Sequence, residues 1–391
     1  MSRQSNQSVM SFEPLESRTF LTISALSIQG QETSYGTEVT IVGTSDADQI
    51  SISRTDRLVI TNNGTTRTYR GSIARIRVYG SGGDDAIIID PGLKLDAVVY
   101  GGEGNDTIRA GAGNDQIFGG SGRDVCYGYG GNDTFVSIGT SKSDYNWGGT
   151  GVDNFWIDNF STEVVSDLSA EESAKGTLHR VGGFATFGGN SISRELNGQD
   201  LADPTLAAGA SGYTDFSDQP LFPQSGPGAD DICQGQLGDC YFLSTLSAIA
   251  KVNPQVIRNS VVDLGDGTYA VQFYNGTTPT FVRVDGELPT YSWGGLAYSR
   301  AGRQGAIWAA VMEKAFAFQR YGTGSYSSIE SGWMGEAFSA LGITSSSIWS
   351  ATDATTLLKR IQSELSAGKA VTFATAGEVS PLVASHAYMV D

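Results

Sequence analysis

A nine-residue period between residues 101 and 136 constrains the fold of this chain more than any other feature. Four consecutive copies are rich in glycine at their start, carry an aspartate at the sixth position and place an apolar residue or cysteine at the eighth. Glycine adopts the positive φ that tight turns require, and a unit this short buries its apolar side chain only by stacking on its neighbours. We therefore predict a parallel β-roll over residues 38–160. A flexible glycine-rich spacer, the alternative, does not explain a period kept in phase over four copies.

The same repeats supply a regular set of carboxylates. Looser copies at residues 80–88 and 148–156 extend the pattern, and residues 80–160 contain 12 acidic and 4 basic residues, so the roll should repel itself unless a cation is bound. Carboxylate and turn carbonyl oxygens are the hard ligands that Ca²⁺ prefers. The pattern resembles the RTX nonapeptide repeat, a calcium-binding β-roll motif. The resemblance implies these calcium ligands: Asp85, Asp106, Asp115, Asp124, Asp133 and Asp153.

The overall charge of the chain argues against nucleic acid as a partner. The chain has 42 acidic and 25 basic residues and a net charge of −17, whereas phosphate backbones require clustered Lys and Arg. No apolar run approaches the length of a membrane-spanning helix. Residues 15–21 resemble the LExRxLL segment of many exported or surface proteins of certain bacteria. We therefore expect a secreted or cell-surface protein, with a cytoplasmic location left open.

Cysteine and histidine are scarce, which limits the possible Cys–His chemistry. The chain has three cysteines, so at least one thiol is free, and only two histidines. Cys126 occupies the apolar position of its repeat and is predicted to be structural. Cys233 is predicted to be a buried core residue, and His179 an ordinary surface histidine. Cys240 and His386 remain as the candidate catalytic pair.

The segment around Cys240 has the features of a nucleophile site. Phe242, Leu246 and Ile249 follow Cys240 at helical spacing, so Cys240 should lie at a helix N-terminus, where the dipole and unpaired N–H groups stabilise a thiolate. Gln234 lies six residues earlier. Its side-chain amide and the N–H of Cys240 could together form an oxyanion hole.

The rest of the sequence after Asp218 is typical of a mixed α+β domain. A turn is predicted at Asn275-Gly276, between two strands. The predicted strands are 268–274, 280–284, 370–375 and 387–390, and the predicted helices are 307–318 and 354–365.

Several segments of this domain resemble the catalytic domain of calpains, which are papain-like cysteine proteases. They are Gln234-Gly-Gln-Leu-Gly-Asp-Cys-Tyr-Phe-Leu243, Val284-Asp-Gly-Glu-Leu-Pro289, Met312-Glu-Lys-Ala-Phe-Ala317 and Ser385-His-Ala-Tyr388. The resemblance implies a two-subdomain endopeptidase that hydrolyses protein or peptide substrates through a thioester. In that role Cys240 is the nucleophile, His386 the base and then the acid, and Gln234 the oxyanion donor.

The resemblance also bears on calcium within the protease domain. In calpains one calcium site uses residues just before the nucleophile, and Gly226 and Asp231 match these positions. The acidic partner of that site is replaced here by the sequence Ser325-Tyr326-Ser327. The resemblance therefore implies Gly226 and Asp231 as further metal ligands, in a site that lacks one acidic residue.

Together these features predict a multidomain protein. We expect an N-terminal segment over residues 1–37, the β-roll over 38–160, a linker over 161–211 and an incomplete calpain-like domain over 212–391. The family's third catalytic residue, an asparagine in an N-P-W segment, would follow Asp391. Two alternatives remain: a transglutaminase-like acyl transferase, which the motif set disfavours, and a catalytically inactive calcium-binding surface protein that keeps the protease scaffold.

Overall fold

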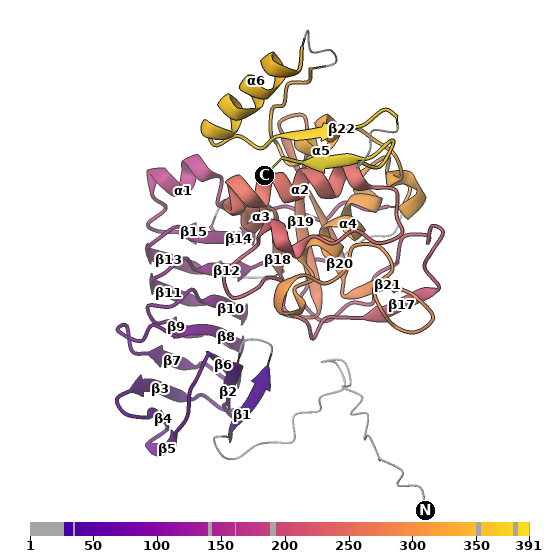
Figure 1. The fold of residues 1–391 in the computed structure, drawn as a ribbon. Coiled ribbons are helices and arrows are strands. Elements are labelled where there is room, and N and C mark those ends of the chain that lie inside the picture. The colour runs from indigo at the N-terminus through magenta and orange to yellow at the C-terminus, as the bar shows by residue number, and fades with distance from the viewer. Residues whose placement is uncertain are drawn as a thin grey trace, which may run out of the picture.

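The computed structural model describes residues 27–33, 36–139, 143–160, 162–187, 193–348, 353–377 and 382–390. A tall, narrow stack of strands stands beside a mixed domain of helices and short sheets (Figure 1). The segment at residues 15–21 lies outside the described residues. Among the residues described, no helix has the length and apolar character needed to cross a membrane.

The stack is a β-roll, and in the part of the chain that the structure describes it consists of two eight-stranded sheets. Successive strands alternate between the sheets and pair in parallel with the strand one coil away, except at the N-terminal end, where β1–β2 and β3–β4–β5 are antiparallel. The first sheet contains β1 (Ser27–Thr33), β2 (Gly36–Val42), β6 (Arg75–Gly82), β8 (Asp96–Glu103), β10 (Gln116–Ser121), β12 (Thr134–Ser137), β14 (Asn154–Asp158) and β16 (Leu178–Val181). The second contains β15 (Val164–Val165), β13 (Tyr145–Thr150), β11 (Val125–Gly130), β9 (Thr107–Arg109), β7 (Ala86–Ile89), β3 (Gln49–Arg54), β4 (Leu58–Asn62) and β5 (Thr65–Tyr69).

The apolar position of each repeat forms the core between the two sheets. Ile108, Ile117, Cys126 and Phe135 are all buried there, and the ring of Phe135 stacks on Phe155 in the next coil with centroids 4.9 Å apart. The predicted β-roll and the structural role of Cys126 are confirmed. The period determines this arrangement because each copy places the same side chain inward on the next strand.

The roll continues beyond the predicted end at residue 160, so the first part of the expected linker is wrong. After β15 the chain forms α1 (Ala170–Lys175) and then β16, in which Leu178 pairs with Phe155 of β14. Strands β15 and β16 continue the parallel ladders although the glycine period has ended, because unpaired strand edges and apolar side chains still require partners. Strand β1 likewise begins before residue 38.

The second domain is built around two buried helices. They are α2 (Cys240–Val252) and α4 (Trp308–Gln319), and the rings of Phe242 and Phe316 stack between them with centroids 4.2 Å apart. The other helices are α3 (Pro254–Ser260), α5 (Met334–Ala340) and α6 (Ala354–Ser366), with short 3₁₀ turns η2 (Ala229–Asp231), η3 (Arg303–Gly305) and η4 (Tyr326–Ile329).

Among the described residues, three small antiparallel sheets complete this domain. They are β18 (Val261–Asp263), β19 (Thr268–Asn275) and β20 (Thr278–Asp285); β17 (Gly212–Asp215) with β21 (Glu287–Thr290); and β22 (Thr372–Ala374) with β23 (Ala387–Met389). The predicted helices and strands of this domain are confirmed. The turn between β19 and β20 lies at Gly276-Thr277, one residue later than predicted, because Asn275 still pairs with Thr278. The α+β class follows from this alternation of elements.

The two domains share a continuous apolar interface. The outer face of the first roll sheet contributes Phe118 and Trp156, and the sheet of β18, β19 and β20 contributes Val262 and Phe281 to one buried cluster. The side-chain amide of Asn154 also donates to the carbonyl of Arg258 at 3.1 Å. The roll is therefore packed against the second domain rather than tethered to it (Figure 1).

His179 lies within this interface, so the prediction of a surface histidine is wrong. Its ring is almost fully buried, stacks on Trp156 with centroids 4.1 Å apart and contacts the side-chain oxygen of Gln272 through Nδ1. Burial lowers the pKa of His179 to about 4. Its partner Gln272 comes from a strand far along the chain, a contact that the local sequence does not reveal.

Candidate active site and carboxylate ladders

Cys240 is the first residue of α2, as predicted, and its side chain is half-buried. The backbone N–H of Ala387 donates to its Sγ at 3.4 Å. That N–H and the N-terminal end of the helix both stabilise a thiolate. The sequence places Cys240 here because Gly238 and Asp239 end the preceding loop and an apolar helix follows.

His386 immediately precedes β23, the strand that carries Ala387 to the nucleophile. The backbone N–H of His386 donates to Oγ1 of Thr375 at 3.2 Å, and its carbonyl accepts from the N–H of Thr375 at 2.9 Å. The imidazole lies edge-on to the ring of Tyr388, with centroids 4.7 Å apart. The fold thus brings the segments of Cys240 and His386 together from opposite ends of the domain.

Gln234 lies in the loop before the nucleophile, with its amide directed into that loop. Nε2 donates to the carbonyl of Leu237 at 2.8 Å and to Oδ1 of Asp239 at 3.4 Å. These bonds hold the loop between Gln234 and Cys240 in a fixed shape. The role of Gln234 as oxyanion donor stays a prediction.

Replacing Gln234 with Ala tests that role. If its amide stabilises the developing oxyanion, kcat should fall by about 10²-fold while KM for a peptide substrate stays nearly unchanged. Steady-state kinetics of the two proteins provides the measurement. A rise in KM alone would show that Gln234 only shapes the cleft wall.

A buried pair of acids behind the nucleophile was not predicted from the sequence. The carboxyl groups of Asp239 and Glu313 contact each other, and both side chains are buried. Burial raises the pKa of Asp239 to about 6 and that of Glu313 well above its usual range. Two touching carboxyls in a dry site share a proton. This pair supports the residue that precedes Cys240, and the Gly-Asp-Cys and Met-Glu-Lys motifs were its only sequence signal.

Cys233 is exposed, so the prediction that it belongs to the core is wrong. It lies in the loop between η2 and α2, where no helix or strand face directs it inward. Cys126 is buried inside the roll, and burial raises the pKa of its thiol well above the ordinary value.

The predicted metal ligands of the roll lie in two ladders of carboxylates. In each ladder one carboxylate oxygen accepts a hydrogen bond of 2.7 to 3.1 Å from a backbone N–H one coil earlier. One ladder is formed by Asp85, Asp106, Asp124, Asp144 and Glu163. The other is formed by Asp115, Asp133, Asp153 and Glu172. All six predicted aspartates belong to these ladders, and Asp144, Glu163 and Glu172 extend them.

The second carboxylate oxygens form sites that suit a hard cation. Within the part of the chain that the structure describes, Oδ2 of Asp85, Asp106 and Asp133 is buried and accepts no hydrogen bond. A Cβ added to Gly80 would come within 2.3 Å of both Oδ2 of Asp85 and the carbonyl oxygen of Gly101. Because Gly80 has no side chain, the carboxylate of Asp85 and the carbonyl oxygen of Gly101 can lie close together. Both are ligand types that Ca²⁺ prefers.

Burial also makes these carboxyls weak acids in the metal-free protein. Burial is the largest cause that raises the pKa of Asp106 to about 6, of Asp85 to about 7 and of Asp133 to about 9. A bound divalent cation would favour the ionised form of each.

The predicted metal ligands in the second domain, Gly226 and Asp231, are met by an arginine. The guanidinium of Arg303 bonds to the carboxylate of Asp231, with Nε 2.7 Å from Oδ1. Its Nη2 also lies 3.4 Å from the carbonyl oxygen of Gly226. The residues present here do not fit a calcium ion.

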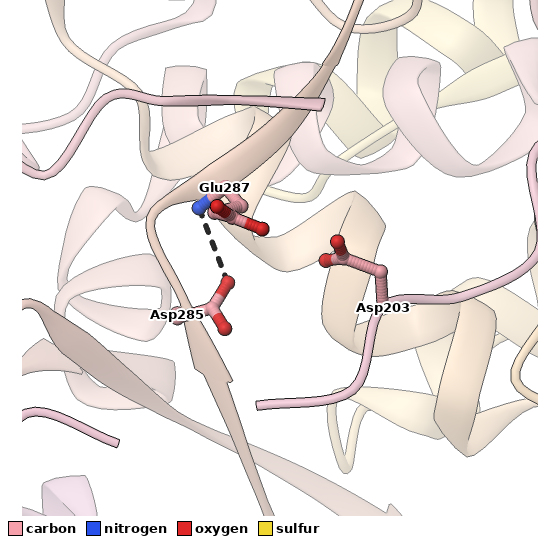
Figure 2. Close-up of side chains that lie close together, drawn as sticks. All are labelled: Asp203, Asp285 and Glu287. Atoms are coloured by element: carbon pink, nitrogen blue, oxygen red, sulfur yellow. Dashed lines mark hydrogen bonds between the residues drawn. The ribbon is translucent and has the colours of Figure 1, made fainter. Parts of the chain in front are cut away.

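Another acidic group in this domain could in principle hold a metal. Asp203, Asp285 and Glu287 place carboxylate oxygens within 4.8 Å of one another (Figure 2). However, Nζ of Lys314 lies 2.5 Å from Oδ1 of Asp203 and 2.6 Å from both Oδ1 of Asp285 and the carbonyl of Glu287. The cation of this group is the lysine itself.

A cysteine at the N-terminus of a buried helix is contacted by the residue that follows a histidine from a second region of the domain, which brings together the two segments that a cysteine peptidase needs. Residues 213–391 match the profile of the calpain family cysteine proteases, and residues 100–135 match four copies of the RTX calcium-binding nonapeptide repeat. The chain thus carries a calpain-type protease domain and RTX-type repeats.

Several curated proteins are similar to the protease domain. The calpain-type cysteine protease ADL1 of Oryza sativa subsp. japonica is 32% identical over 125 residues, which are 31% of this chain and 6% of that protein. Human calpain-14 is 33% identical over 114 residues, which are 27% of this chain and 16% of that protein. The chicken calpain-2 catalytic subunit is 30% identical over 131 residues, which are 32% of this chain and 18% of that protein. The chain therefore spans less than a fifth of each of these relatives.

Proposed function

We propose that residues 212–391 act as a calcium-dependent cysteine endopeptidase on protein substrates. The observation that carries this proposal is the position of Cys240. It lies at the N-terminus of α2, and its Sγ accepts a hydrogen bond from the N–H of Ala387, the residue that directly follows His386. Separate peptide segments meet at this thiol, as cysteine peptidase chemistry requires.

The proposed reaction is amide hydrolysis through an acyl-enzyme. The thiolate of Cys240 attacks the scissile carbonyl, and the developing oxyanion is met by the N–H of Cys240 and the amide of Gln234. His386 takes the thiol proton and gives it to the leaving amine, which departs and leaves a thioester. Water activated by His386 then releases the acid and restores the thiol.

We further propose that the roll binds Ca²⁺ through its carboxylate ladders. Support comes from the buried second oxygens of Asp85, Asp106 and Asp133 and from the carbonyl oxygens beside them. Because the roll packs on the sheet of β18, β19 and β20, calcium that orders the roll also stabilises the protease domain. Calcium is abundant outside cells, so a secreted or cell-surface location suits such a protein.

Thiol labelling tests the assignment of Cys240. With iodoacetamide at about pH 6, where ordinary thiols are mostly protonated, Cys240 should react first. Exposed Cys233 serves as the internal control for access, because it has no helix N-terminus beside it, and Cys126 should react only when the roll unfolds. Peptide mapping after brief exposure identifies the adduct, and His386→Ala should remove the fast reaction.

Release of dye from labelled casein tests the activity itself. The full-length protein should release dye, and Cys240→Ala should abolish the release. If Cys233 is labelled as fast as Cys240, the nucleophile is wrongly assigned. Fast labelling of Cys240 without casein hydrolysis would favour the inactive scaffold instead.

A further inference from the structure

We infer that Arg303 replaces a calcium ion at the position of Gly226 and Asp231 in the protease domain, so that calcium does not regulate this protein through that site. This inference rests on the proposed function only for what it says about regulation. Its evidence is the set of contacts around Asp231, and its tests measure calcium binding and stability rather than catalysis.

The carboxylate of Asp231 is fully buried and already surrounded by donors. Oδ1 accepts from the backbone N–H of Arg303 at 3.2 Å and from its Nε at 2.7 Å. Oδ2 accepts from Nη2 of Arg303 at 3.2 Å, from Nε1 of Trp308 at 3.1 Å and from the N–H of Gly228 at 2.7 Å. A carboxylate offers about four acceptor positions, so these five donors leave no oxygen lone pair for a metal.

The guanidinium also reaches the other oxygen ligand expected at this position. Nη2 of Arg303 lies 3.4 Å from the carbonyl of Gly226, and Nη1 lies 3.2 Å from Oγ of Ser225. One cationic group therefore contacts both predicted calcium ligands. A divalent cation placed there would meet a fixed positive charge and too few free oxygens, since Ca²⁺ takes six to eight.

The backbone is shaped to receive this arginine. A Cβ on Gly228 would lie 2.5 Å from Nη2 of Arg303, and a Cβ on Gly302 would lie 2.6 Å from Cα of Asp231. Gln304 has a φ of 56°, in the left-handed region that non-glycine residues rarely adopt. The Arg303 side chain is 41% exposed, but its partner Asp231 is fully buried, and the backbone of both segments leaves room for the pair.

The pair fixes the chain that leads to the nucleophile. Asp231 ends η2, which precedes the Gln234–Cys240 loop, while Arg303 and Trp308 belong to η3 and the start of α4. The arginine thus joins the two segments, as a metal ion would, through contacts that do not require calcium. The local order of this loop should not depend on calcium.

The first experiment counts bound calcium by isothermal titration calorimetry on the full chain. Asp231→Asn keeps the size of the side chain and should leave the calcium stoichiometry of the wild type unchanged. Arg303→Gln should add one weak calcium site, because Asp231 and Gly226 then regain free oxygens. The double variant Arg303→Gln with Asp231→Asn should lose that site. A stoichiometry that falls by one in Asp231→Asn, or no added site in Arg303→Gln, overturns the inference.

The second experiment compares thermal unfolding with chelator and with calcium. Arg303→Gln should lower the Tm of the protease domain by several degrees in chelator, and calcium should recover part of the loss. Arg300→Gln, an exposed arginine three residues earlier, is the matched control and should change little. An unchanged Tm in Arg303→Gln overturns the inference. If Arg303→Gln does not fold, the comparison of wild type with Asp231→Asn still decides it. Failure of Cys240 to react would leave all these readouts unaffected.

Discussion

Removing calcium with a chelator is expected to unfold the β-roll at about pH 8 and to do so much less at about pH 5. In the metal-free roll, burial raises the pKa of Asp106, Asp85 and Asp133 to about 6, 7 and 9. The folded roll therefore binds more protons than the unfolded chain. Its stability without metal falls as pH rises above the unfolded value of 3.8 and through this range, because each carboxyl must ionise without a counter-ion.

Far-UV circular dichroism of the chain, with and without chelator at both pH values, measures this effect. Asp133→Asn should stabilise the metal-free roll at the higher pH, since it removes a buried charge, and should weaken calcium binding. Asp46→Asn, an exposed acid in the same roll, is the control and should do neither. Equal β-structure in chelator at both pH values would contradict a calcium-clamped roll.

Replacing Lys314 with Met is expected to destabilise the protease domain by about 3–5 kcal/mol. Nζ of Lys314 is the cation beside Asp203 and Asp285, and the lysine side chain is fully buried. Removing it leaves ionised carboxyls facing one another in the interior (Figure 2). Such a loss is a large part of the stability of a typical domain.

Denaturant unfolding followed by tryptophan fluorescence gives the magnitude. Lys359→Met, an exposed lysine on α6, is the matched control and should change stability by no more than about 0.5 kcal/mol. Adding Asp285→Asn to Lys314→Met should recover part of the loss, because one of the uncompensated charges is then removed. If Lys314→Met and Lys359→Met unfold alike, the buried group does not stabilise this domain.

The features that the sequence predicted correctly are those set by short-range spacing. The nine-residue period determined the roll, the inward position of Ile108, Ile117 and Phe135, and the carboxylate at each turn. Apolar spacing after Cys240 determined that a helix starts there. In both cases the signal lies within one element, so the period and the turn residues are sufficient evidence.

The features that the sequence missed depend on partners far along the chain. His179 is buried by Gln272 and Trp156, and the lack of an element face leaves Cys233 exposed. The end of the roll was misplaced because β15 and β16 continue its hydrogen bonds after the glycine pattern stops.

For the candidate site, the sequence alone determined which residues carry the chemistry, and the tertiary structure decided which charges meet. The motifs identified Cys240, His386 and Asp231, but only the fold set Arg303 against Asp231 and Lys314 against Asp203. The sequence around an acidic residue is the same whether a metal ion or an arginine neutralises its carboxylate. Which cation is present depends on the packing of distant segments, because desolvation makes a buried carboxylate require a partner without specifying from where in the chain it comes.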